Sequence, residues 1–271
     1  MDLGLKDVHV LVTGASGGIG LATTRLFLSQ GALVSAHYRS NSSTLQPLTA
    51  EYPDRIRGIQ ADLESEAEVE KAFKKAVDAF GGHPVQVIVI NHGAWESKDV
   101  PLAEMSLNQW NTSLSVLLTS PFMVAREFLK GLKDARAELK DKASIVMIGS
   151  TAGKYGEANH ADYAACKSAM MYGLTLSLKN EIVAIAPKGR VNTVAPGWVF
   201  TPLAEEALKD PAVVYRSLAT TPLKKFAQPI DIATQIVMLS SPIVSGHVTG
   251  QVVMVEGGME GRLLNRPEDL P

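Results

Sequence analysis

Three features that would mark particular classes of protein are scarce or missing in this sequence. The 271 residues include one cysteine, Cys166, so an internal disulfide and a cysteine-based metal cluster are both excluded. The 26 basic and 28 acidic residues nearly balance, which argues against a partner such as a nucleic acid or an anionic membrane. No run of about 18 apolar residues occurs, so no transmembrane helix is predicted.

The N-terminus also lacks a basic segment followed by an apolar run, which is the pattern of a secretory signal. We therefore expect a cytoplasmic protein. With 46% hydrophobic residues the chain can bury a large core, and α/β folds of this length commonly form one unit. We predict a single domain over residues 1–271, whose last part, 261–271, is an extended tail without an interpretable pattern.

A glycine-rich turn follows the apolar run Val8–Val12 and leads into a helical pattern that ends near Gln30. The turn contains Gly14, Gly18 and Gly20, a spacing that differs from the common G-x-G-x-x-G. Glycines let the backbone approach a pyrophosphate closely, and free N–H groups at a helix start complement its charge. Strand, turn and helix therefore indicate dinucleotide binding, although an ordinary tight turn has the same bare pattern.

A second group of residues follows the predicted strand 143–149. Ser150 lies at the end of this strand, where open α/β sheets bind ligands. Tyr163 and Lys167 are four residues apart on the next predicted helix, so their side chains leave the same face. An ammonium group favours phenolate and lowers the pKa of a neighbouring phenol below about 10, which makes a usable acid at neutral pH. A surface Tyr–Lys pair is the alternative interpretation of the spacing alone.

The glycine spacing and the set Ser150, Tyr163 and Lys167 together resemble the classical short-chain dehydrogenase/reductase family over almost the whole chain. The resemblance implies an α/β fold: a single-domain, Rossmann-type, doubly wound sheet of about seven parallel strands with helices on both faces. It also implies hydride transfer between a nicotinamide cofactor and a small-molecule carbonyl or alcohol substrate. In that reaction Tyr163 is the general acid or base, Ser150 steadies the substrate oxygen, and Lys167 holds the nicotinamide ribose.

The end of the predicted strand Ala32–Tyr38 decides between the two nicotinamide cofactors. NAD-binding proteins usually present an acid there, which bonds the ribose 2′-hydroxyl and repels a 2′-phosphate. This chain has no acid at that place and carries Arg39 and Ser40, whose guanidinium and hydroxyl suit a phosphate. We therefore predict NADP(H), with a merely solvated loop arginine as the alternative.

The resemblance implies further cofactor contacts along the chain. Asp62 would bond the adenine amino group, although it could equally start the helix predicted near Ser65. Val199 and Thr201 would bind the nicotinamide amide. The remaining expected contacts are Ser16, Ile19, Leu63, Asn91, Gly93, Pro196 and Gly197.

Two segments depart from the family pattern. The family motif Asn-Asn-Ala-Gly is replaced by Asn91-His92-Gly93-Ala94, and we expect His92 to be a fixed, hydrogen-bonded loop residue rather than a catalytic base. In relatives an asparagine of the catalytic tetrad holds a water linked to the active-site lysine, and here Leu117 has that position. Proton supply to Lys167 must then use another water path, near Ser113 or Ser115. Alternatively, the chain is a cofactor-binding scaffold with a non-redox or regulatory role.

Residues 202–222 are predicted to form short helical pieces interrupted by prolines, a pattern typical of a substrate lid. The aromatic residues Trp95, Trp198, Phe200 and Tyr215 either line the pocket or serve as plain packing. Relatives commonly form tetramers, and small residues that would let two helices approach support a homotetramer here. These residues are Ala161, Ala164, Ala165 and Ala169.

Overall fold

Seven parallel strands form a single sheet in the part of the chain that this computed structural model describes, residues 2–95 and 98–261. The strands are β1 (His9–Val12), β2 (Leu33–Tyr38), β3 (Ile56–Gln60), β4 (Val87–Ile90), β5 (Ser144–Ile148), β6 (Arg190–Pro196) and β7 (Val252–Val255). Their order across the sheet is β3-β2-β1-β4-β5-β6-β7, and every neighbouring pair is parallel. The predicted doubly wound sheet is therefore confirmed.

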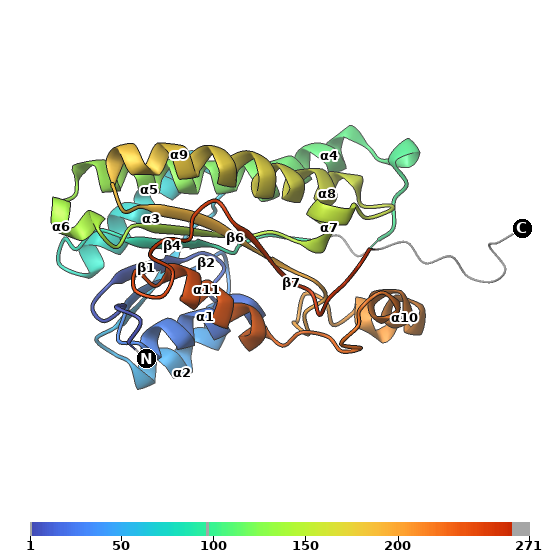
Figure 1. Cartoon of the computed structure of the whole chain (residues 1–271), viewed down its shortest axis with the longest axis horizontal. Coiled ribbons are helices and arrows are strands. Elements are labelled where there is room, and N and C mark those ends of the chain that lie inside the picture. The colour runs from blue at the N-terminus through green and yellow to red at the C-terminus, as the bar shows by residue number, and fades with distance from the viewer. Residues whose placement is uncertain (1, 96–97, 262–271) are drawn as a thin grey trace, which may run out of the picture.

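Helices cover both faces of this sheet (Figure 1). One layer consists of α1 (Gly18–Ser29), α2 (Gln46–Glu51) and α11 (Pro229–Ser240). The opposite layer consists of α3 (Glu66–Ala79), α4 (Leu107–Leu114), α5 (Ser120–Asp134), α6 (Ala137–Lys140), α8 (Ala161–Ser168) and α9 (Thr175–Ile185). The short helix α7 (Thr151–Tyr155) leads from β5 into α8, and α10 (Pro211–Ala219) lies apart from the sheet at one end of the molecule.

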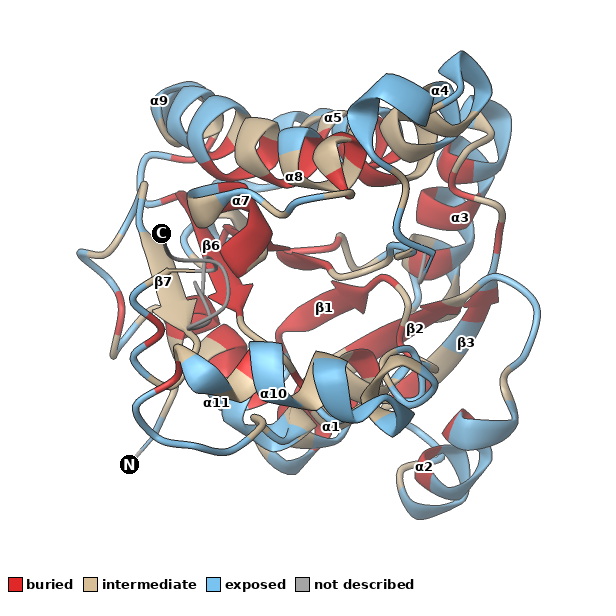
Figure 2. Ribbon diagram, turned by 90° about the vertical axis from the view of Figure 1, so that its right-hand side faces the viewer, coloured by how far each residue is buried: buried red, intermediate tan, exposed pale blue. Residues whose placement is uncertain are grey.

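Alternation along the strands divides the core into two clusters, one on each face. In β1, Val10 and Val12 pack toward α1 and α11, whereas Leu11 between them packs in the opposite cluster. Strands buried on both faces are mostly apolar, and β1, β4 and β5 are buried throughout. Figure 2 shows this burial for β1. Phe27 anchors the first cluster and Phe128 the second.

The strand order changes direction at β1, which pairs with β2 on one side and with β4 on the other. The helices that leave these strands consequently cover opposite faces, and a crevice remains beyond the carboxyl ends of the strands. Open α/β sheets bind ligands in such a crevice. The topology therefore predicts the position of the site before any side chain is considered.

Two π-helical turns interrupt long helices near this crevice. The turn Ser115–Thr119 joins α4 to α5, and the turn Ala169–Leu174 joins α8 to α9. Single π turns are frequent at functional sites. The small and apolar residues from Ala164 to Lys179 predict a helix buried all round, and this prediction is wrong, because Tyr172 and Leu176 are exposed.

The predicted lid, 202–222, contains a short 3-10 turn, Ala207–Lys209, and the helix α10. The expected tail falls almost wholly outside the described residues. Within the described part of the chain, no helix is both long enough and apolar enough to cross a bilayer.

Candidate active site

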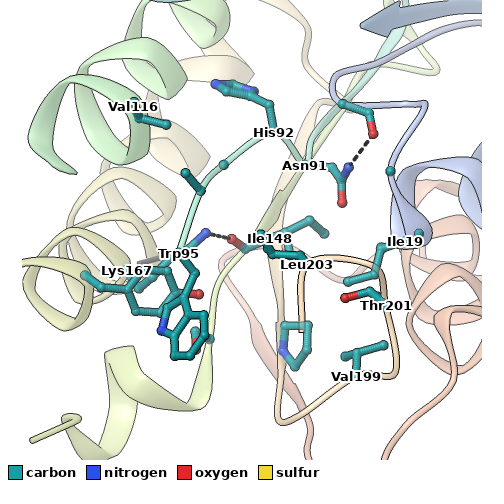
Figure 3. Close-up of a pocket in the computed structure, with 18 of the residues that line it drawn as sticks. Ile19, Asn91, His92, Trp95, Val116, Ile148, Lys167, Val199, Thr201 and Leu203 are labelled. Carbon is teal, nitrogen blue, oxygen red and sulfur yellow. Dashed lines mark hydrogen bonds between the residues drawn. The ribbon is translucent and has the colours of Figure 1, made fainter. Parts of the chain in front are cut away.

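A cavity of about 500 Å³ opens at the carboxyl ends of the central strands (Figure 3). The glycine turn after β1 and the Asn91 turn after β4 line one part of it. Ser150, Tyr163 and Lys167 line another part, and the loop from Gly197 after β6 completes the wall. Segments far apart in the sequence thus meet where the topology places the crevice.

The glycine turn is tightly folded against β4. Gly14 has a φ of +63°, in the left-handed region that glycine adopts without strain. A Cβ on Gly20 would lie 2.1 Å from the Gly14 carbonyl oxygen, so only glycine fits there. The Asn91 amide donates to the carbonyls of Thr13 (3.0 Å) and Gly14 (3.2 Å), which fixes the turn to the end of β4.

The first turn of α1 faces the cavity. Gly18 and Ile19 line it, and a Cβ on Gly18 would lie 2.8 Å from Thr201 Cγ2 on the opposite wall. The helix N-cap is Gly17, and no described side chain caps this helix. Helix N-termini with uncapped N–H groups attract anions, so this end of the cavity suits a pyrophosphate.

The three expected catalytic residues lie on consecutive elements. Ser150 is the N-cap of α7, where its Oγ accepts a hydrogen bond from the Ala152 N–H at 3.1 Å. This bond leaves the hydroxyl proton free to be donated toward the cavity. Tyr163 and Lys167 both project from α8 into the same cavity, as the four-residue spacing predicts.

Lys167 is a buried cation. Its Nζ donates to the Ile148 carbonyl at 2.8 Å and lies 5.7 Å from the centroid of the Tyr163 ring. Burial lowers the pKa of Lys167 to about 8, because a charged ammonium is poorly solvated in this position. The side chain is therefore still mostly protonated at neutral pH, beside the phenol.

His92 is hydrogen-bonded through both ring nitrogens, as expected of a fixed loop residue. Its Nδ1 lies 2.8 Å from Thr13 Oγ1, and its Nε2 lies 2.7 Å from Ser120 Oγ. Thr13 Oγ1 also accepts from the backbone N–H groups of Asn91 and His92 and lies 3.1 Å from the Val89 carbonyl oxygen, so this hydroxyl joins the His92 ring to the ends of β1 and β4. Burial lowers the pKa of His92 to about 3, so the ring is neutral, and one of its two nitrogens donates while the other accepts.

Leu117 occupies the π turn behind the cavity rather than its wall. The side chain is only 3% exposed and packs against the backbone of Gly93, where a Cβ would lie 3.2 Å from Leu117 Cδ2. Two departures from the family pattern are thus neighbours in space. A leucine fits at position 117 because position 93 carries no Cβ.

The expected water path near Ser113 or Ser115 receives no support. Ser113 Oγ donates to Asp162 Oδ2 at 2.6 Å, and Ser115 Oγ donates to Glu64 Oε2 at 2.8 Å. Neither serine is among the described residues that line the cavity. Both hydroxyl protons are therefore directed to carboxylates and away from Lys167.

Arg39 lies at the far end of the cavity and faces two carboxylates. Its Nη2 is 3.2 Å from Asp62 Oδ2 and 3.5 Å from Glu64 Oε1. The sequence indicated no acid near this arginine, and that expectation is wrong. Asp62 does not begin α3, because Ser65 is its N-cap.

Most of the expected cofactor contacts line the cavity, but Gly20 and Ser40 are not among its described lining residues. Gly20 instead packs on Gly14. Trp95 and Trp198 line the cavity, whereas Phe200 and Tyr215 do not. The expected residues on its wall are Gly14, Ser16, Gly18, Ile19, Arg39, Asp62, Leu63, Asn91, Gly93, Ser150, Tyr163, Lys167, Pro196, Gly197, Val199 and Thr201.

The sequence interpretation missed two carboxylates on the wall, Glu64 and Glu157. Glu64 follows the β3 strand that pairs with β2, so the strand register could have placed it beside Arg39. Glu157 follows α7 at Gly156, whose φ of +73° turns the chain. No spacing rule marks a residue in such a turn.

Comparisons with known proteins agree with this geometry. Residues 14–260 match the family model described as enoyl-(acyl carrier protein) reductase. The 3-oxoacyl-[acyl-carrier-protein] reductase of Vibrio cholerae is 33% identical over 258 residues, covering 95% of this chain and 99% of the relative. A putative ketoacyl reductase of the monensin polyketide synthase from Streptomyces virginiae is 32% identical over 261 residues, covering 92% and 95% respectively.

Two solved structures give the same result. A short-chain dehydrogenase/reductase titled glucose/ribitol dehydrogenase, from Brucella melitensis, superposes with a TM-score of 0.82 at 34% identity, covering 96% of this chain and 99% of that one. A short-chain dehydrogenase/reductase mutant from Serratia marcescens gives 0.83 at 25% identity, covering 95% and 99%. With the matched family model and these relatives, the chain belongs to the short-chain dehydrogenase/reductase family of oxidoreductases.

Proposed function

We propose that this protein is an NADP(H)-dependent oxidoreductase that reduces a ketone or aldehyde to an alcohol, or catalyses the reverse oxidation. One observation carries the proposal. The glycine turn and the set Ser150, Tyr163 and Lys167 line one cavity, at the carboxyl ends of a doubly wound sheet. Relatives named 3-oxoacyl-[acyl-carrier-protein] reductases support carbonyl reduction as the class of reaction.

The residues present fit a nicotinamide dinucleotide. Gly14 and Gly18 have no side chains, so the backbone of the turn is open to a pyrophosphate in the cavity. The uncapped N-terminus of α1 complements the negative charge of that pyrophosphate. Arg39 supplies a guanidinium at the far end for a 2′-phosphate. The bound cofactor would supply or accept the hydride of the reaction.

The chain's own groups then manage the proton. We assign Tyr163 as the general acid in reduction and the general base in oxidation, because its phenol lies in the cavity beside the Lys167 ammonium. The Ser150 hydroxyl, with its proton available, steadies the substrate oxygen that Tyr163 protonates. Lys167 favours the phenolate form of Tyr163 electrostatically and offers its remaining protons to the nicotinamide ribose.

In this proposal, protons return to Lys167 from water in the open cavity. Leu117 has no polar group, and Ser113 and Ser115 are bonded to carboxylates. Lys167 itself lines the open cavity, so waters there reach its Nζ from the substrate side. The predicted lid contributes Leu203 and Ala204 to the same wall, and we propose that it closes over the substrate.

Leu117 also supports a second candidate function. A chain without the tetrad asparagine is compatible with a cofactor-binding scaffold that has a non-redox or regulatory role. Such a scaffold would have no need to keep Ser150, Tyr163 and Lys167 on one cavity wall, so we rank it second.

Oxidation of NADPH over a panel of ketones and aldehydes distinguishes the two functions. The oxidoreductase is expected to oxidise NADPH in proportion to carbonyl consumed, with alcohol formed in equal amount. Tight cofactor binding without turnover on any carbonyl of the panel, or with any alcohol and NADP⁺, would favour the scaffold.

A further inference from the structure

A buried histidine, His37, lies beside the glycine turn, and no step of the proposed mechanism uses it. It is the next-to-last residue of β2, is 3% exposed, and is among the residues that line the cavity. Its Nδ1 lies 3.1 Å from the Gly14 nitrogen, and its Nε2 lies 3.1 Å from the carbonyl oxygen of Ala61. The ring therefore joins the glycine turn after β1 to the residue that follows β3.

The two partners of this ring fix where its proton lies. The Ala61 carbonyl can only accept, so Nε2 of His37 carries the proton. The Gly14 N–H can only donate, so Nδ1 presents a lone pair. Both bonds exist together only in the neutral ring. Burial, which is the largest influence, lowers the pKa of His37 below its ordinary value of 6.5, so the neutral form prevails at neutral pH.

The titratable neighbours of His37 come from three elements. Asp62, after β3, favours the charged ring, but its effect is smaller than that of burial, and its carboxylate is paired with Arg39 at 3.2 Å. The neutral His92 ring, after β4, has its centroid 6.5 Å from that of His37. On β1 the titratable side chain is His9, at the amino end of the strand and away from the turn. The glycine turn, residues 13–20, has no titratable side chain in its sequence.

The bond from Gly14 to His37 holds one side of a peptide that is also held on the other. The Gly14 carbonyl accepts from the Asn91 amide at 3.2 Å and packs on Gly20 in the first turn of α1. The next N–H of the turn, that of Ala15, donates to the His37 carbonyl at 2.7 Å. His37 thus binds two consecutive N–H groups of the turn. A shift of Gly14 would reach the start of α1, the end of the cavity that suits a pyrophosphate.

We propose that His37 is a positioning residue for the dinucleotide: its neutral ring holds Gly14 in the conformation that binds the pyrophosphate, and protonation of the ring releases the turn. The proposal rests on the cofactor site of the function proposed above and adds a residue that acts through the turn. In a protonated ring both nitrogens donate, so Nδ1–H would face the Gly14 N–H and the turn would have to move. The contact is therefore intact at neutral pH and is lost as the pH falls through the pKa of the buried ring, below 6.5.

Calorimetric titration with NAD⁺ tests this role. NAD⁺ is the probe because the 2′-phosphate of NADP⁺ itself takes up a proton with a pKa of about 6, whereas the charge of NAD⁺ stays constant between about pH 8 and about pH 5. His37→Leu removes the acceptor and keeps similar bulk. His37→Asn keeps an acceptor, Oδ1, near the place of Nδ1 and takes up no proton in this range. His9→Asn is the matched control, at a second buried strand histidine at the opposite end of the sheet.

At about pH 8 we expect His37→Leu to bind NAD⁺ roughly threefold to tenfold more weakly than the wild type, which corresponds to one hydrogen bond, and His37→Asn to stay within about twofold. Between about pH 8 and about pH 5 the wild type should lose affinity about threefold more than His37→Asn does, because only the wild type has a ring to protonate. His9→Asn should follow the wild type at both pH values. Thermal unfolding at each pH shows that the proteins compared are folded.

Wild-type affinity in His37→Leu at about pH 8 would overturn the proposal. Equal losses of affinity in the wild type and His37→Asn on acidification would overturn it too. So would a His9→Asn protein that binds NAD⁺ as weakly as His37→Leu, because the effect would then follow from the loss of any strand histidine. If His37→Leu does not fold, the pH comparison of the wild type with His37→Asn decides alone. A wild type that binds no nicotinamide dinucleotide would contradict the proposed function itself, and this proposal with it.

Discussion

Arg39 is the residue on which the proposed preference for NADP(H) depends. Its guanidinium faces Asp62 and Glu64, so a 2′-phosphate must compete with two carboxylates for one cation. Glu64 is further held by Ser115, which keeps its carboxylate at this end of the cavity. We therefore expect the protein to bind NADPH more tightly than NADH, but with a smaller difference in affinity than an unpaired arginine would give.

This preference can be measured by titrating both cofactors. Arg39→Ala should weaken NADPH binding about tenfold and leave NADH nearly unchanged, because only the phosphate loses a partner. Glu64→Gln should strengthen NADPH binding several-fold by removing a competing charge. Ser115→Ala removes a hydrogen bond to Glu64 without changing charge and serves as the control. The NADP assignment fails if the wild type binds both cofactors equally, or if Arg39→Ala leaves the selectivity unchanged.

At the same scale, the sequence located most of the candidate site. Gly14, Ser150, Tyr163 and Lys167 are recognisable because their chemistry depends on fixed spacing along the chain. Glu157 and Glu64 were missed because their importance depends on which other segments the fold brings beside them. The pairing of Arg39 with acids more than 20 residues later depends on the β2–β3 register.

Among the elements, the strands were predictable and the π turns were not. The predicted strand Ala32–Tyr38 is observed as Leu33–Tyr38, because a mostly apolar run directly after the turn residue Gly31 marks it. A π turn inserts one residue into a helix whose 3.6-residue pattern continues on both sides, so no local signal marks Ser115–Thr119. The helix α11 also went unpredicted, although Pro229 stands at its first turn.

The π turn between α4 and α5 predicts a coupling between Leu117 and Gly93. Gly93→Ala places a Cβ 3.2 Å from Leu117 Cδ2 and should destabilise the fold by about 1–3 kcal/mol. Leu117→Ala empties a buried site and should lower the free energy of unfolding by about 2–5 kcal/mol. Because the second change makes room for the first, the double variant should be more stable than the sum predicts by at least about 0.5 kcal/mol.

Urea unfolding of the wild type and the three variants gives this coupling energy. Strictly additive losses would mean that Leu117 and Gly93 do not constrain each other. In that case the two departures from the family pattern would be independent.

The whole molecule carries an apolar surface on its outer helices. On α5, the side chain of Phe122 is 44% exposed. The continuous helix formed by α8, the π turn and α9 exposes Tyr172 (43%), Leu176 (39%) and Val183 (43%). The two helices are neighbours in one layer (Figure 1). The sequence predicted close helix contact from four alanines, and one of them, Ala165, is exposed on α8. We propose that this surface joins copies of the chain, most simply into the predicted homotetramer.

Sedimentation at micromolar protein concentration tests the assembly. The wild type should sediment as an oligomer, and Leu176→Glu should shift it to smaller species because a charge would be buried at the interface. Ile243→Glu, at an exposed apolar residue elsewhere on the surface, should leave the distribution unchanged. A wild type that sediments only as a monomer would contradict this proposal.

Also at the scale of the whole molecule, a comparison of two tyrosine variants tests the central claim. This claim is that Tyr163 transfers the proton in a redox reaction at the carboxyl ends of the sheet. Tyr163→Phe removes the phenolic hydroxyl alone, and Tyr155→Phe is the matched control, since Tyr155 donates to the Met259 carbonyl and is absent from the described cavity lining. We expect Tyr163→Phe to bind NADPH within about twofold of the wild type and to lose on the order of 10²–10⁴ in kcat, with Tyr155→Phe near normal. A Tyr163→Phe protein that oxidises NADPH over a carbonyl at the wild-type rate would contradict the mechanism.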